Sequence, residues 1–99
     1  MVVIEESALK AAKLKKADYV VKVLSASGGE FDIDVKSIII ELVQEFEAPS
    51  GYKEFEYEGV KVYINKNLII EDDLLIYRRY KLPIIGSVWG IKGVSIKYM

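Results

Sequence analysis

The residues that decide the fold are 55–80, which read FEYEGVKVYINKNLIIEDDLLIYRRY. Val60, Val62 and Ile64 alternate with polar residues, a period of two that indicates a strand with one buried face. The preceding Glu58-Gly59 suits a two-residue hairpin turn, because glycine adopts positive φ without a Cβ clash. Two later polar breaks, at 65–67 and 71–73, are typical of further turns. The stretch is therefore predicted to form a meander of antiparallel strands.

The N-terminal half is predicted to supply a helix and a hairpin. Residues 5–16 carry acids at the start and lysines at the end, which suits a helix dipole, and their small apolar face is built mostly of alanines. Residues 19–24 and 30–35 predict two paired strands, joined by a turn over the flexible residues 25–29.

A second helix is predicted over residues 37–47. Ser37 is a suitable cap, and Pro49 shortly after the segment cannot continue a helix. The apolar residues follow the i, i+1, i+4, i+5, i+8 spacing of one helical face: Ile38, Ile39, Leu42, Val43 and Phe46.

The predicted fold class is α+β, a mostly antiparallel β-sheet meander with two α-helices packed on it, in a single domain of residues 1–99. Near the end of the chain, glycines at 86, 90 and 93 break up the last apolar run. The alternating residues 94–98 predict a final strand.

The composition excludes several chemistries. The chain has no Cys and no His, which removes disulfides, thiolate and imidazole catalysis, and the usual zinc and iron–sulfur ligands. No apolar run reaches the about 18 residues of a membrane span, and residues 1–6 do not resemble a signal peptide, so we expect a soluble, intracellular protein without membrane contact. Many charged and few amide side chains are typical of a thermostable protein.

The sharpest candidate site is a basic and aromatic segment near the C-terminus. Residues 77–99 hold five basic and no acidic residues, whereas residues 17–50 hold seven acids against two lysines. Cationic side chains contact phosphates and tyrosines stack on bases, so we predict nucleic-acid contacts from Tyr77, Arg78, Arg79, Tyr80, Lys81 and Lys92. The alternative is a charged strand end that pairs with acids elsewhere, and the acidic pI of about 5.5 opposes strong non-specific binding.

Weaker candidates have simpler structural explanations. Glu30, Asp32 and Asp34 share one face of a predicted strand and could hold a hard cation, although exposed strands often carry such acids. The glycines at 28 and 29 precede a strand rather than a helix, so a turn explains them better than an anion loop. The carboxylates at 72–73 have no evident partner base. We therefore predict no catalytic residues, no metal site and no cofactor.

The leading functional hypothesis is a non-enzymatic protein that acts through a protein–protein interface as a homodimer. It depends on a hydrophobic fraction of 52%, above the usual 45–50% or so, and on the absence of any catalytic motif. Scattered tyrosines and Trp89 would serve such an interface, because these residues are enriched where subunits meet. The runner-up is the nucleic-acid binder, and a carboxylate-based enzyme is third.

Two resemblances accompany this interpretation. Residues 57–64 (YEGVKVYI) and 90–93 (GIKG) resemble the C-terminal half of small HesB-like proteins, but the cysteines that define that family are missing, so no iron–sulfur function is implied. In length, in its Cys- and His-free composition and in runs such as residues 67–77 (NLIIEDDLLIY), the whole chain resembles the small proteins of filamentous archaeal viruses. That resemblance implies a hyperthermophilic, acidic host and the host cytoplasm, and it supplies no activity and no site residues.

Overall fold

The structure, a computed structural model, describes residues 1–28, 33–82 and 86–96. This part of the chain is mostly β, which makes the predicted α+β class wrong. In chain order its elements are β1 (Val2–Ile4), α1 (Glu6–Lys15), β2 (Asp18–Gly28), β3 (Ile33–Val43), β4 (Tyr52–Tyr57), β5 (Val60–Asn65), β6 (Leu68–Leu82) and β7 (Gly86–Ile96).

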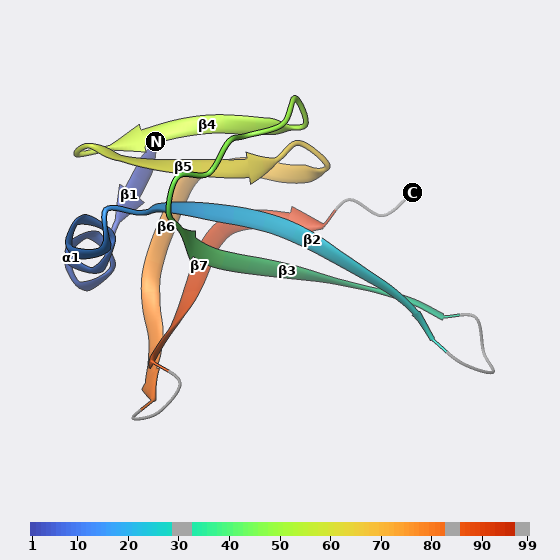
Figure 1. The fold of residues 1–99 in the computed structure, drawn as a ribbon. Coiled ribbons are helices and arrows are strands. Elements are labelled where there is room, and N and C mark those ends of the chain that lie inside the picture. Colours follow the sequence, from blue (N-terminus) through green and yellow to red (C-terminus); the bar gives the residue numbers. More distant parts are fainter. Residues whose placement is uncertain (29–32, 83–85, 97–99) are drawn as a thin grey trace.

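The strands form two mixed sheets instead of one meander. The first has the order β1-β6-β7 and the second β3-β2-β5-β4. Two pairs, β1 with β6 and β2 with β5, are parallel, and the other ladders are antiparallel. The β2–β3 and β6–β7 hairpins project from the body in different directions, and α1 lies at one end, beside β1 (Figure 1).

The first predicted helix is confirmed and its boundaries follow from its charges and its last residue. Glu6 lies in the first turn, and lysines at 13 and 15 lie in the last turn, as the dipole favours. Lys16 adopts the left-handed conformation (φ 51°) and ends the helix. Ala8 and Ala12, one turn apart, are fully buried, so the helix approaches the sheets closely on its alanine face.

The predicted Glu58-Gly59 turn is also confirmed. Both residues have positive φ, 48° and 86°, as a two-residue hairpin turn of the I′ type requires, and they join β4 to β5 in an antiparallel pair. The next turn is also present, where the Asn67 backbone N–H donates to Asn65 Oδ1 at 2.9 Å. After it, however, the chain crosses to the other sheet, so β5 pairs with β2 and not with β6.

The predicted second helix does not exist, because Ser37 to Val43 belong to β3. Three consecutive isoleucines at 38–40 favour extended chain, since β-branched side chains are restricted in a helix. Ile38, Ile40 and Leu42 pack against the core, while Ile39 on the opposite face is also partly buried. Because both faces of the strand are partly buried, apolar residues stand next to each other in the sequence. Their positions therefore also fit the spacing of apolar residues on one face of a helix.

The predicted β2–β3 hairpin is confirmed with a different register. The strands run further than expected, so residues 25–28 continue β2 instead of turning, and Leu24 lies opposite Ser37. The anion-loop candidate at 27–29 falls partly in this strand and partly outside the described residues.

Strand β6 continues through the predicted break at residues 71–73, where its pairing with β7 is irregular. Gly93, at φ +93°, lies opposite this irregularity, and a Cβ there would collide with the Asp73 carbonyl oxygen. Gly90 lies inside β7 under the ring of Tyr77. The predicted breaks at Gly90 and Gly93 are therefore wrong, because both glycines allow close packing within a continuous strand.

The core lies between the two sheets and α1. Its largest fully buried members are Tyr19 and Val21 of β2, Val62 and Ile64 of β5, and Ile76 of β6. A smaller apolar cluster covers the outer face of the four-stranded sheet.

In that outer cluster, Phe46 from the β3–β4 connection packs its ring against Tyr63 (5.1 Å between centroids) and Tyr52 (5.5 Å). Val20, paired with Tyr63 in the ladder, is also fully buried. The connection between β3 and β4 thus covers the outer face of the four-stranded sheet, which the predicted second helix had been expected to cover.

A candidate interface groove between the helix and the β6–β7 hairpin

The structure divides the predicted basic and aromatic segment between two faces of the β6–β7 hairpin. Tyr77 pairs with Gly90 and Arg78 pairs with Trp89, and consecutive strand residues point to opposite faces. The register shifts between Arg78 and Tyr80, so Arg79 occupies an irregular position. The segment therefore does not form one continuous platform.

On one face, Tyr77 and Lys92 form a cation–π pair. The Lys92 ammonium lies 5.5 Å from the centroid of the Tyr77 ring, and the ring rests against Gly90. Arg79 is exposed nearby in sequence. The side chains of Tyr80 and Lys81, the remaining two predicted contacts, lie outside the described residues.

On the other face, Arg78 joins an aromatic stack that reaches the core. Its guanidinium carbon lies 5.8 Å from the centroid of the Trp89 ring. Trp89 meets Tyr19 edge to face at 5.5 Å and 79°, and the Tyr19 hydroxyl donates a 2.8 Å hydrogen bond to the Ala8 carbonyl of α1. The stack thus links β6, β7, β2 and the helix.

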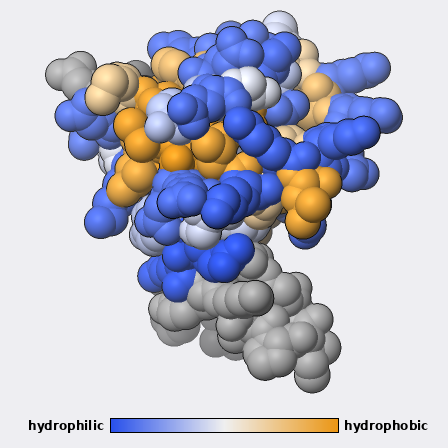
Figure 2. All heavy atoms as spheres, turned by 90° about the vertical axis from the view of Figure 1, so that its left-hand side faces the viewer, coloured by the Kyte–Doolittle hydropathy of each residue, from blue (hydrophilic) through white to orange (hydrophobic). Residues whose placement is uncertain are grey.

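Beside this stack lies a groove of about 770 Å³ between α1 and the β6–β7 hairpin. Leu14 of the helix is 85% exposed here, an unusual state for a large aliphatic side chain. On this side of the molecule, hydrophobic side chains lie among hydrophilic ones (Figure 2). The groove is lined by Glu5, Glu6, Ser7, Lys10, Ala11, Leu14, Lys15, Arg78 and Trp89.

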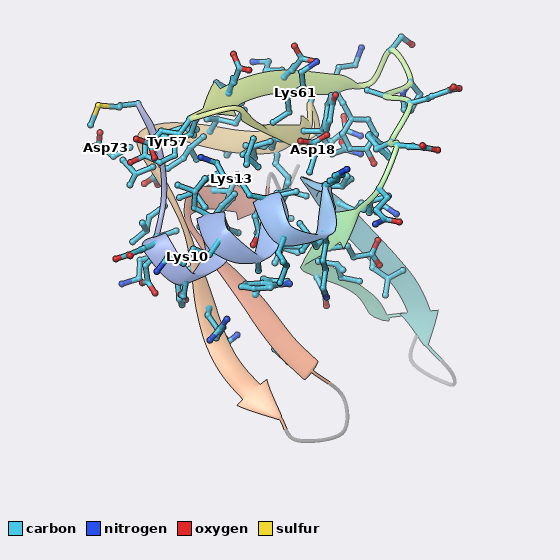
Figure 3. The ribbon with its side chains drawn as sticks, turned by 60° about the vertical axis from the view of Figure 1, so that its left-hand side comes forward. Lys10, Lys13, Asp18, Tyr57, Lys61 and Asp73 are labelled. Carbon is cyan, nitrogen blue, oxygen red and sulfur yellow. The ribbon has the colours of Figure 1, made fainter. Side chains whose placement is uncertain are left out.

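Only some of the charged side chains along the groove interact with another side chain of the groove. Glu6 pairs with Lys10 at 3.0 Å, and the Ser7 hydroxyl donates to Glu5 at 3.0 Å. Lys15 has no carboxylate partner among the described residues. In Figure 3, Lys10 extends from the helix on the side of the β6–β7 hairpin and Lys13 on the side of β4 and β5, so only the first of these lines the groove.

Arg78 has a buried donor without an acceptor among the described residues. Its Nε is inaccessible to solvent and has no hydrogen-bond acceptor within the part of the chain that the structure describes. Burial raises the pKa of the Tyr19 hydroxyl far above its usual range, and the positive charge of Arg78 lowers this pKa in part. An unpaired buried N–H costs roughly 1–3 kcal/mol, so this donor lowers the stability of the folded chain.

Sequence reasoning identified Arg78 but treated Trp89 mainly as packing and overlooked Leu14. Their proximity depends on the pairing of β6 with β7 and on where α1 docks, which no local pattern shows. A signal for Leu14 did exist. Leu14 lies two residues beyond Ala12 and therefore away from the alanine face of the helix. Its exposure to solvent could have been predicted from this position.

The weaker candidate sites in the sequence involve acidic residues. Among the side chains that the structure describes, no three acidic groups gather as a metal site. The cation candidate of Glu30, Asp32 and Asp34 lies outside the described side chains. No helix in the described ranges is long and apolar enough to cross a membrane.

Comparison of the chain with protein-family models, with curated proteins and with solved structures finds no match.

Proposed function

We propose that the protein acts by associating with a second copy of itself, and that the groove between α1 and the β6–β7 hairpin is the interface. The observation that carries this proposal is the exposure of Leu14 (85%) in the same groove as Trp89 and Arg78, an arginine that forms no ion pair with a described residue. An apolar side chain, an aromatic ring and an arginine within a charged rim are the usual composition of an interface centre.

The energetic gain comes from two sources. Covering Leu14 would contribute roughly 1.5–3 kcal/mol, because its side chain is almost fully in contact with water in the single chain. A carboxylate of the partner could accept a charge-assisted hydrogen bond from Arg78, which lines the groove. Trp89 and Arg78, already stacked on each other, lose little conformational freedom on binding, so more of this gain is retained.

Sedimentation velocity over a range of micromolar concentrations tests this proposal. We expect the wild-type protein to sediment above the 11.2 kDa of one chain, and Leu14→Lys to weaken association by about tenfold or more. Leu24→Lys is the matched control, since Leu24 is 54% exposed but does not line the groove. A wild-type protein that stays at one chain's mass at every concentration would refute the proposal.

Nucleic-acid binding is the second candidate, and the pair formed by Tyr77 and Lys92 favours it. A half-buried ring with a cation above it, next to the exposed Arg79, could contact a base and a phosphate. A salt titration with single- and double-stranded DNA and RNA tests this function. Binding that weakens in Lys92→Ala would support it, and no binding at low salt would remove it.

A further inference from the structure

We propose that the segment that enters the groove is the acidic edge strand β4 of the second copy, with Glu54 and Glu56 directed at Arg78 and Lys15. The inference rests on the proposed self-association and adds to it the identity of the docking segment.

The groove favours carboxylates because its cations outnumber its acids and two of these cations form no ion pair with a described residue. Lys10, Lys15 and Arg78 give the groove three positive charges against the two negative charges of Glu5 and Glu6, a net charge of +1. Arg78 and Lys15 both line the groove, and neither forms an ion pair with a residue in the described part of the chain. Charge-assisted hydrogen bonds from these two cations to carboxylates are about twice as strong as neutral ones.

Strand β4 presents carboxylates in a regular row at the outside of the molecule. It is the last strand of the order β3-β2-β5-β4 and lies at the margin of the sheet in Figure 1. Glu54 and Glu56 are exposed and share one face of the strand, while Phe55 between them packs against the core. Strand geometry therefore fixes the spacing of the two carboxylates before any contact is made.

These carboxylates are available to a partner. Glu56 forms no ion pair with any described residue, and Glu54 meets Lys61 at a long 3.7 Å, with both side chains about half exposed, and also interacts with Tyr63. An exposed pair of this kind contributes only about 0–1 kcal/mol, so little stability is lost when Glu54 changes partner. By contrast, Glu41 of the other edge strand is held by Lys22 at 3.0 Å.

The groove and β4 use different residues of the chain. None of the groove-lining side chains belongs to β4, so one copy can receive a strand and offer its own at the same time. The two surfaces also carry opposite excess charge, which steers like molecules into this orientation and penalises groove-to-groove contacts.

Charge reversal of the two surfaces tests the docking directly. The edge variant is Glu54→Lys with Glu56→Lys, and the groove variant is Lys15→Glu with Arg78→Glu. We expect each to associate at least about tenfold more weakly than wild type, and an equimolar mixture of the two to recover association as a mixed complex. Lys15→Glu alone, at an exposed helix position, serves as a second groove variant if the double variant does not fold.

The chain contains one tryptophan, and it lies in the groove, so its fluorescence reports occupancy of the site independently of sedimentation. The matched control is Glu45→Lys with Glu47→Lys, which makes the same change of charge in the β3–β4 connection. This control is expected to associate as wild type does, with the same concentration dependence of the Trp89 emission.

The outcomes separate the two proposals. If Leu14→Lys weakens association while the edge variant associates normally, or if the mixture fails to recover it, β4 is not the docking segment and the groove interface stands. If the wild type does not self-associate at all, both proposals fall. Emission changes on adding a single-stranded oligonucleotide, without self-association, would assign the groove to nucleic acid instead.

Discussion

Replacing Tyr19 by phenylalanine tests how the helix is held over the core. The ring of Tyr19 is fully buried, and its hydroxyl donates to the Ala8 carbonyl at 2.8 Å. Phenylalanine keeps the ring and the edge-to-face contact with Trp89 but removes the donor. At neutral pH we expect a loss of about 1 kcal/mol in the free energy of unfolding, the typical net value of one such bond.

The same substitution has a predicted pH dependence. Burial raises the pKa of Tyr19 above its ordinary value near 10, and the charge of Arg78 opposes this rise in part. Below that ordinary value the phenol is neutral in both the folded and unfolded states, so its full contribution to stability is present. Above it the unfolded chain loses the proton first, and stability falls by about 1.4 kcal/mol per pH unit until the folded phenol also ionises.

Phenylalanine has no proton to lose, so the wild type should lose its advantage over Tyr19→Phe near about pH 11. The measurement is urea unfolding of both proteins at neutral pH and at several values between about pH 9 and 11.5. Lysines and the other tyrosines titrate in both proteins and cancel in the difference. A difference that stays constant as the pH passes 10 would refute the burial of this phenol, and equal stabilities at neutral pH would refute its hydrogen bond.

Three further substitutions test separate parts of the fold. Gly93→Ala should destabilise the protein by about 2 kcal/mol or more, since φ is +93° and a Cβ would meet the Asp73 backbone; a thermal melt with an unchanged midpoint would contradict this. Glu58→Asn should stabilise the β4–β5 turn by roughly 0.5 kcal/mol, because asparagine tolerates the φ of 48° better, and a lowered melting temperature would contradict the turn type. Phe46→Ala should cost about 2 kcal/mol, less than a fully buried phenylalanine, by uncovering Tyr63; wild-type stability in urea would show that Phe46 does not cover the sheet.

Local features of the fold were predictable from the sequence. The first helix and the Glu58-Gly59 turn depend on residues within a few positions of each other, such as the glycine that accepts positive φ, and both are confirmed. The alternation of Val60, Val62 and Ile64 correctly indicated a strand. The strand that pairs with this segment could not be predicted in the same way. β5 pairs with β2, some forty residues earlier, and hydrogen bonds between such distant segments do not affect the local sequence pattern.

The error at residues 37–47 has a different origin. Apolar residues at 38, 39, 42, 43 and 46 fit one face of a helix, and they fit a strand that is partly covered on both faces equally well. The three β-branched residues at 38–40 were the signal that favoured the strand. The candidate site shows the same limit, since Arg78 was identifiable as a cation, but its contact with Trp89 and its position beside Leu14 depend on the docking of three elements.

Ala8 and Ala12 are the innermost residues of α1, and each contributes one methyl group to the space between the helix and the strands beneath it. The separation of helix and strands is therefore set by side chains of minimal volume, and the opposite side of the same helix forms a wall of the groove. A larger residue at either alanine would push the helix outward and displace that wall without altering any groove residue. The shape of the groove is thus controlled from inside the protein, and evolution or design could adjust it there.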